Sequence, residues 1–211
     1  MATKRSRRRR NRQRLTILIA AVVVILGIVI TIISVNAANA AKLKLRYKEY
    51  PLRYKDAIME YAAEYGLEPE HVAAVIRCES SFDPKALSDV GARGLMQLMP
   101  DTGVWAAQKL KQSDVYEDSF LYEPEINIEY GCWYLNWLMD RYDRNILHTT
   151  AAYHAGFGEV DKWLQDPVLC KADGTLDPDK IPFDTTRVYV GRIFKAYDNY
   201  KELYDFDTEA A

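Results

Sequence analysis

The sequence predicts a predominantly α-helical domain preceded by a single transmembrane helix. Two observations support this fold class. Residues 15–35, LTILIAAVVVILGIVITIISV, form an uncharged and almost wholly apolar run. After about residue 50, apolar residues recur at the spacing of helix faces, and no segment shows a convincing alternation of apolar and polar residues typical of a half-buried strand. We therefore expect an all-α domain after the membrane segment.

The N-terminal region has the features of a membrane anchor. Its apolar run of 21 residues is long enough to span a hydrocarbon core of about 30 Å at 1.5 Å per residue. Basic residues on the preceding flank favour a cytoplasmic N-terminus, with the rest of the chain extracellular or periplasmic. We therefore expect a single-pass protein of the cell membrane, with residues 1–14 as its cytoplasmic tail. The basic residues of that tail are Lys4, Arg5, Arg7, Arg8, Arg9, Arg10, Arg12 and Arg14.

A cleaved signal peptide is the competing interpretation of the same region. Residues 36–41, NAANAA, are small enough to contain an A-x-A-like cleavage site. The apolar run, however, exceeds the usual 7–15 residues of a signal-peptide core. We favour a retained anchor, followed by a linker at residues 36–49, a folded domain at residues 50–205 and a C-terminal tail at residues 206–211.

The charge distribution excludes one class of function. The chain has 28 basic and 30 acidic residues, but without the eight bases of the tail about 20 bases remain. The exported part is therefore clearly acidic, which argues against nucleic acid as a partner. Its three cysteines, Cys78, Cys132 and Cys170, form neither a metal-like cluster nor a dense disulfide framework. We expect no metal or cofactor, and we prefer free thiols to a disulfide between Cys78 and Cys132.

The helices of the domain follow from apolar stripes and from the residues that begin and end them. Pro51 suits a first helical position, and Gly66 suits the end of the same helix. Pro69 opens the next helix, and Asp101 or Thr102 is expected to cap a later one. Residues 113–123 and 166–184 are predicted loops. Helices are predicted at residues 51–65, 69–79, 102–110, 126–142, 149–155, 158–164 and 186–204.

Glu79 is the first candidate for chemistry. Val72, Val75, Ile76 and Glu79 have the i, i+3, i+4, i+7 spacing of one helix face. A carboxyl group at the end of an apolar face is desolvated, and desolvation raises its pKa and favours the protonated form. A general acid needs that form near neutral pH. A glutamate at a helix end is more often a solvated residue or a cap, so this pattern alone is weak.

The segment after Glu79 adds residues typical of a binding loop. Gly91 and Gly94 precede the sequence LMQLMP. Glycine permits a tight turn or a close approach to a ligand. Met96 and Met99 are flexible apolar side chains, while the Gln97 amide both donates and accepts hydrogen bonds. The segment therefore suits the floor and wall of a binding groove.

Four sequence blocks resemble the soluble lytic transglycosylase-like (SLT) family. ESSF at residues 79–82 and GARGLMQLMPDT at residues 91–102 resemble its signature. AAYHAG at residues 151–156 resembles the family's A-x-YNAG block, and IPFDTTRVYV at residues 181–190 resembles IP-aromatic-x-ETR-x-YV. The resemblance extends over about residues 54–204. It implies a lysozyme-like fold and cleavage of peptidoglycan glycan strands.

The same resemblance assigns roles to individual residues. It implies that Glu79 is the catalytic acid/base and that Tyr153 and Tyr189 line the saccharide groove. Two positions depart from the family pattern, because His154 replaces an asparagine and Thr185 replaces a glutamate, with Asp184 beside it. The expected substrate-binding residues are Ser80, Gly94, Met96, Gln97, Tyr153, His154 and Tyr189.

The implied reaction is cleavage of the β-1,4 bond between MurNAc and GlcNAc with a 1,6-anhydro product. Because the substrate's C6 hydroxyl attacks, no second carboxylate is needed; Asp83 and Asp89 are the nearest candidates, and Asp83 reads as part of a turn with Pro84. A hydrolytic muramidase like the goose-type lysozymes and an inactive wall-binding or assembly module stay open as alternatives. Cell-wall or secretion machinery is left open as a partner.

Overall fold

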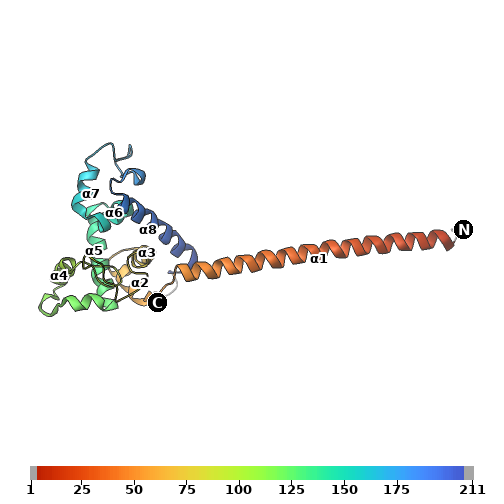
Figure 1. Ribbon diagram of the computed structural model, residues 1–211, viewed down its shortest axis with the longest axis horizontal. Coiled ribbons are helices and arrows are strands. Elements are labelled where there is room, and N and C mark those ends of the chain that lie inside the picture. The colour runs from red at the N-terminus through yellow and green to blue at the C-terminus, as the bar shows by residue number, and fades with distance from the viewer. Residues whose placement is uncertain (1–3, 207–211) are drawn as a thin grey trace. The chain divides into compact units, whose positions relative to one another are not determined.

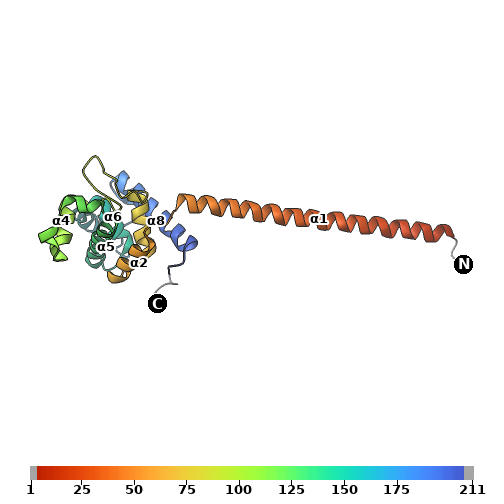
Figure 2. The same cartoon turned by 90° about the horizontal axis from the view of Figure 1, so that it is seen from below.

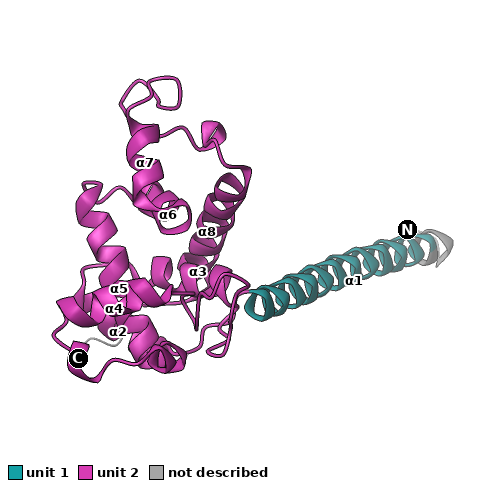
Figure 3. Ribbon diagram, turned by 60° about the vertical axis from the view of Figure 1, so that its left-hand side comes forward, with its two compact units in different colours: residues 1–49 teal, residues 50–211 magenta. Residues whose placement is uncertain are grey.

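The computed structural model describes residues 4–206. The chain divides into two compact units, Met1–Glu49 and Tyr50–Ala211, which are coloured separately in Figure 3.

The first unit is one long helix, α1, Lys4–Glu49. It contains a segment that is long and apolar enough to cross a membrane, and none of that segment is buried. The hydroxyls of Thr16 and Thr31 donate to the carbonyls of Arg12 and Gly27, four residues earlier. Hydroxyls satisfied within their own helix suit a nonpolar surrounding. Residues 36–49, expected as a separate linker, continue the same helix, because their alanines, leucines and lysines are good helix formers.

The second unit is built from helices, as expected (Figures 1 and 2). Among the described residues, β pairing is limited to isolated bridges. Three short 3-10 helices, η1 (Ser113–Val115), η2 (Asp118–Tyr122) and η3 (Pro178–Lys180), lie in segments predicted as loops. The α-helices are α2 (Lys55–Glu64), α3 (Pro69–Glu79), α4 (Pro100–Lys109), α5 (Pro124–Arg141), α6 (Ile146–Ala155), α7 (Phe157–Leu164) and α8 (Asp184–Leu203).

The structure corrects three predicted helix starts, those of α2, α4 and α5. Pro51 lies outside α2, and Tyr54 precedes that helix with a left-handed backbone, φ 55°. α4 begins at Pro100 without a side-chain cap, so neither Asp101 nor Thr102 caps it. Proline suits the first helical turn because its fixed φ is helical and its missing N–H has no intrahelical acceptor there. The same reason places the start of α5 at Pro124, two residues before the predicted start.

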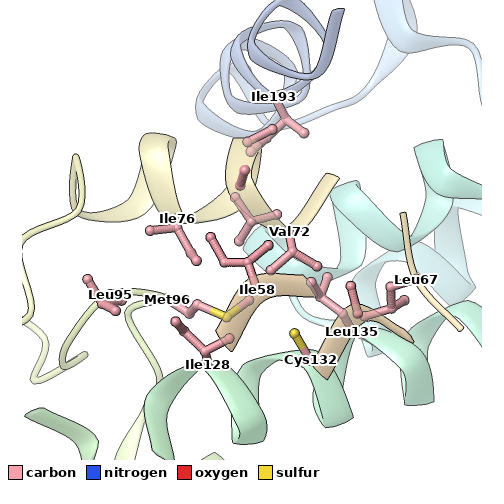
Figure 4. Close-up of a cluster of buried hydrophobic side chains, with 14 of the residues drawn as sticks. Ile58, Leu67, Val72, Ile76, Leu95, Met96, Ile128, Cys132, Leu135 and Ile193 are labelled. Atoms are coloured by element: carbon pink, nitrogen blue, oxygen red, sulfur yellow. The ribbon is translucent and has the colours of Figure 1, made fainter. Parts of the chain in front are cut away.

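The core of this unit surrounds α3. Six consecutive residues of α3, from His71 to Ile76, are buried, so the helix is covered on all sides. It packs most extensively against α8 and also contacts α2, while α5 contacts α2, α4, α6 and η2. Figure 4 shows side chains of α2, α3, α5 and α8 meeting in this core. This packing holds the C-terminal end of α3, where Glu79 lies, between α8 and the loop that follows.

The three cysteines, Cys78, Cys132 and Cys170, are free thiols. Cys132 is fully buried within the core around α3, and Cys78 is partly buried beside Glu79. Burial raises the pKa of both thiols, so the neutral thiol form is favoured.

Candidate active site

Glu79 lies at the last position of α3 and is partly buried. The Tyr189 hydroxyl donates a hydrogen bond to its Oε1 atom at 2.6 Å. Burial raises the pKa of Glu79 to about 7, against the opposing effects of that hydrogen bond and of the Arg192 charge. Near neutral pH the protonated and ionised forms are therefore both populated. This is the condition under which one carboxyl group serves as acid and then as base.

Helix α8 supplies Tyr189 and Arg192, the two side chains that lower the pKa of Glu79 and so act against the effect of burial. Tyr189 and Arg192 are three residues apart, so they lie on the same face of the helix. Arg192 also donates to the carbonyl of Cys78 at 3.3 Å, which joins α8 to the last turn of α3. Sequence reasoning identified Tyr189 but missed Arg192. A basic residue three positions after Tyr189 on the same helix is the feature that would have identified Arg192.

Two predicted binding residues use their side chains to hold the loop after α3. The Ser80 hydroxyl donates to the carbonyl of Leu95 at 2.7 Å. The Gln97 amide donates to the carbonyls of Ala86 at 3.2 Å and Gly94 at 3.1 Å. Gln97 also has a left-handed backbone, φ 47°, which is strained for a residue with a side chain. These residues therefore shape the loop beside Glu79.

Gly94 is required by a close approach of the backbone. Its φ is 74°, and a Cβ atom there would lie 2.0 Å from the Leu121 carbonyl oxygen. The same atom would lie 2.5 Å from Nδ2 of Asn127, a fully buried residue of α5. Asn127 accepts from the Met96 N–H at 2.7 Å and donates to the carbonyls of Arg93 and Leu121. Sequence reasoning missed Asn127, although an asparagine within an apolar helix face is a signal.

Met96 differs from the expectation of an apolar substrate surface. Its side chain is fully buried, and a Cβ atom on Gly131 would lie 2.2 Å from its Sδ atom. Met96 therefore packs against the α5 backbone, while its carbonyl accepts a hydrogen bond from the Tyr153 hydroxyl at 2.7 Å. Met99, which is 42% exposed, is the methionine of this loop that faces outward.

The charge of Glu79 acts on both Tyr153 and Tyr189. The pKa of each tyrosine is raised well above its ordinary value, first by burial and then by the charge of Glu79. Both phenols therefore stay neutral and can donate hydrogen bonds. The predicted acid and the two predicted groove tyrosines are brought together from α3, α6 and α8.

His154 and Thr185, the two residues that depart from the family pattern, line one cavity beside Tyr189. The His154 ring lies 4.6 Å from the Tyr189 ring, and its Nδ1 is 3.0 Å from the Thr186 hydroxyl. Burial lowers the pKa of His154, which favours the neutral imidazole. The carboxylate of the neighbouring Asp184 forms an ion pair with Arg187. A cavity of about 400 Å³ is lined by His154, Asp184, Thr185, Val188, Tyr189 and Arg192.

No second carboxylate of the described residues contributes to the shifted pKa of Glu79. Asp83 is exposed and accepts from the backbone N–H of Lys85 at 2.9 Å, so it belongs to a turn, as expected. Asp89 is also exposed. The geometry around Glu79 thus provides one carboxyl group, two phenols and one guanidinium.

Comparison with known proteins gives consistent matches. The family model described as "Transglycosylase SLT domain" matches residues 56–168. A soluble lytic murein transglycosylase of Salmonella typhimurium is 36% identical over 169 residues, covering 80% of this chain and 26% of the relative. A membrane-bound lytic murein transglycosylase C of Actinobacillus pleuropneumoniae is 30% identical over 193 residues, covering 82% of this chain and 51% of the relative.

Solved structures of lytic transglycosylases are also similar to this chain. The 70-kDa soluble lytic transglycosylase of Escherichia coli matches with a TM-score of 0.70 and 32% identity, covering 80% of this chain and 27% of that one. An inactive glutamate-to-glutamine mutant of the lytic transglycosylase Slt of Pseudomonas aeruginosa matches with a TM-score of 0.66 and 32% identity, covering 73% of this chain and 25% of that one. The chain thus spans about a quarter of the length of these soluble relatives.

Proposed function

Because the chain belongs to the transglycosylase SLT domain family, we propose that residues 50–205 form a lytic transglycosylase of the bacterial cell wall. The substrate is the glycan strand of peptidoglycan, cleaved at the β-1,4 bond between MurNAc and GlcNAc. The proposal depends mainly on Glu79. Its carboxyl group is partly buried, has a pKa of about 7 and accepts a hydrogen bond from the Tyr189 hydroxyl. Such a group can give and recover a proton at neutral pH.

The reaction needs only Glu79 as acid and base. Protonated Glu79 gives its proton to the glycosidic oxygen while the bond from that oxygen to C1 of MurNAc breaks. The C6 hydroxyl of the same MurNAc then forms a bond to C1 and releases its proton to Glu79. The products are a GlcNAc hydroxyl end and a 1,6-anhydro-MurNAc end. Glu79 is protonated again, and no water is consumed.

Tyr189 and Arg192 assist the two proton transfers of Glu79. The Tyr189 hydrogen bond stabilises the ionised Glu79 that exists between the two proton transfers. The Arg192 charge acts in the same direction. Ordinary glycosidases place a second carboxylate across the scissile bond to act on water or on the sugar. A nucleophile supplied by the substrate removes that need.

We propose that the loop and the tyrosines around Glu79 form the saccharide groove. Ser80, Gly94 and Gln97 shape its floor through the hydrogen bonds and the close approach described above. Tyr153 and Tyr189 form its wall beside the acid. His154 extends that wall into the hollow shared with Thr185.

We further propose that residues 15–35 cross the cell membrane, with residues 1–14 in the cytoplasm and the catalytic unit outside. The exposed apolar surface of α1 supports the crossing. The arginine-rich N-terminal flank supports the direction. A relative named as membrane-bound agrees with an anchored form.

The proposal is tested by comparing Glu79→Gln with Asp83→Asn on purified peptidoglycan. Glu79→Gln keeps the shape and a hydrogen-bonding amide but cannot transfer a proton. It should lose at least the roughly 10²- to 10⁴-fold attributed to general acid–base catalysis. Asp83→Asn removes only an exposed turn carboxylate and should keep most activity. Substantial release of soluble glycan by Glu79→Gln would refute the proposed role of Glu79.

A further inference from the structure

His154 is an exposed side chain that is nevertheless held at two points by helix α8. Its Nδ1 atom lies 3.0 Å from the hydroxyl oxygen of Thr186, which is fully buried in the first turn of α8. Its ring lies 4.6 Å from the Tyr189 ring, with 32° between the two planes, so the rings face each other. A solvated surface side chain is free to exchange rotamers. These two contacts hold the His154 ring in one place.

Both contacts come from one face of α8. Thr186 and Tyr189 are three residues apart, so they are neighbours on the helix surface. His154 lies in the last turn of α6, which packs against α8 (Figure 3). The imidazole therefore meets Thr186 with its edge and Tyr189 with its face.

The contact with Tyr189 matters because of what the Tyr189 hydroxyl does. That hydroxyl donates to Oε1 of Glu79 at 2.6 Å, from α8 to the end of α3. The strength of such a hydrogen bond depends on the distance and direction of the donor, so it depends on where the phenol ring is held. Tyr189 and His154 also line the same cavity of about 400 Å³. Loss of the His154 ring would leave more room beside the phenol on that side.

His154 does not act on Glu79 directly. Within the described part of the chain, the pKa of Glu79 responds to burial, to the Tyr189 hydrogen bond and to the Arg192 charge. Burial lowers the pKa of His154 itself, which favours a neutral ring that supplies no charge near pH 7. An influence of His154 on the acid therefore passes through Tyr189.

We propose that His154 is a positioning residue, which holds the Tyr189 ring so that the phenol hydroxyl stays on the Glu79 carboxyl group. The inference deepens the proposed function and rests on it for the reaction. A contact between two aromatic rings favours one arrangement by roughly 2- to 10-fold. Because Thr186 fixes the imidazole, it is the Tyr189 ring whose freedom the contact reduces.

The departure from the family pattern supports this role. The pattern has asparagine at this position, where this chain has His154. An asparagine amide could keep the hydrogen bond to Thr186, but it has no ring to place against Tyr189. The ring contact is therefore a feature of the histidine in this chain.

The test measures the pKa of Glu79 in the full chain in detergent. Carboxyl ¹³C NMR of glutamate-labelled protein reports it, and the Glu79 resonance is the one that Glu79→Gln lacks. His154→Leu keeps the cavity filled but has no planar ring and no bond to Thr186. The titration of Glu79 should move up by roughly 0.3 to 1 pH unit, because a less firmly held hydroxyl stabilises the carboxylate less.

Four further variants separate the ring from the hydrogen bond. His154→Phe keeps an aromatic face and should stay close to the parent, whereas His154→Asn should titrate like His154→Leu. Thr186→Val removes the hydroxyl at nearly constant shape, and it should shift the pKa of Glu79 in the same direction by a smaller amount. Thr186→Ser keeps the hydroxyl and should restore the parent value. Thermal melting checks that each variant is folded.

A double-mutant cycle tests the route through Tyr189. In the Tyr189→Phe background the hydroxyl is absent, so His154→Leu should cause no further change in the pKa of Glu79. Additive shifts of the two substitutions would show that His154 acts on the acid by another route, and the inference would be refuted.

The outcomes separate this inference from the proposed function. If the parent cleaves peptidoglycan but His154→Leu changes only KM and leaves the pKa of Glu79 in place, His154 contacts the sugar alone. The inference is then refuted and the function stands. If the parent cleaves nothing, but His154→Leu raises the pKa of Glu79 only while Tyr189 is present, the proposed function fails and the positioning role stands.

Discussion

The protonation of Glu79 is set by opposing effects from two helices. Its place on α3 gives burial, which favours the protonated acid, while α8 contributes a hydroxyl and a guanidinium that favour the carboxylate. Their balance gives a pKa of about 7. The burial followed from the apolar stripe in the sequence. The donors are 110 and 113 positions away, so their contact with Glu79 depends on the tertiary fold.

Tyr189→Phe should move the pH dependence of cleavage. The Tyr189 hydroxyl lowers the pKa of Glu79, so its removal should raise that pKa above about 7. The protonated form is the active acid, and it is lost as pH rises through the pKa. The alkaline limb of kcat/KM should therefore shift to higher pH by about one unit, since a hydrogen bond to a charged group contributes roughly 1.5 kcal/mol.

Arg192 variants provide the control for that profile. Arg192→Gln removes a charge that also lowers the pKa of Glu79, so it should shift the alkaline limb in the same direction. Arg192→Lys keeps the charge and should shift it less. An alkaline limb that stays in place in both Tyr189→Phe and Arg192→Gln would show that Glu79 is not the titrating acid.

The loop after α3 depends on one glycine far more than on its neighbour in the motif. A Cβ atom at Gly94 would overlap the backbone carbonyl of Leu121, whereas a Cβ atom at Gly91 would meet nothing within 4 Å. Gly94→Ala should therefore cost several kcal/mol and abolish cleavage, because the loop must leave Asn127. Gly91→Ala should cost only about 1 kcal/mol from its positive φ.

Urea unfolding of the two glycine variants, with cleavage assays on the same samples, checks this prediction. The pair shares sequence context and substitution, so the difference reports the local surroundings of each glycine. Equal losses of stability in the two variants would contradict the close approach at Gly94.

The sequence predicted the elements better than it predicted what their side chains do. Stripes of apolar residues located α2, α3, α5 and α8, because burial of one helix face leaves a periodic pattern. Helix starts were less accurate, since Pro51 precedes α2 by several residues while Pro100 begins α4. The burial of Met96 against Gly131 could not be read from the sequence, because it depends on the distance between two segments.

At the scale of the whole molecule, the all-α, lysozyme-like fold and the family resemblance are confirmed. The four sequence blocks indicated the family because they follow one another in the order that the resemblance implies. The continuation of α1 through residues 36–49 was not expected, because small residues and alternating bases are compatible with both a linker and a helix. The named relatives include soluble and membrane-bound proteins.

The direction of membrane insertion is open to a direct experiment. If residues 1–14 stay in the cytoplasm, protease added to intact protoplasts should remove the whole unit after α1. The same treatment should leave a membrane fragment that contains the apolar run. A domain that resists protease until the membrane is broken would contradict the proposed topology. A soluble product that lacks the first forty or so residues would instead indicate a cleaved signal peptide.

The central claim is that Glu79 acts alone because the substrate's C6 hydroxyl replaces water. Digestion of purified peptidoglycan in H₂¹⁸O, followed by mass spectrometry of the released glycans, tests it most directly. The claim predicts 1,6-anhydro-MurNAc ends that contain no ¹⁸O, and it predicts no cleavage at MurNAc residues whose C6 hydroxyl is acetylated. Reducing MurNAc ends that carry ¹⁸O would show that water attacks, and the chain would then be a muramidase.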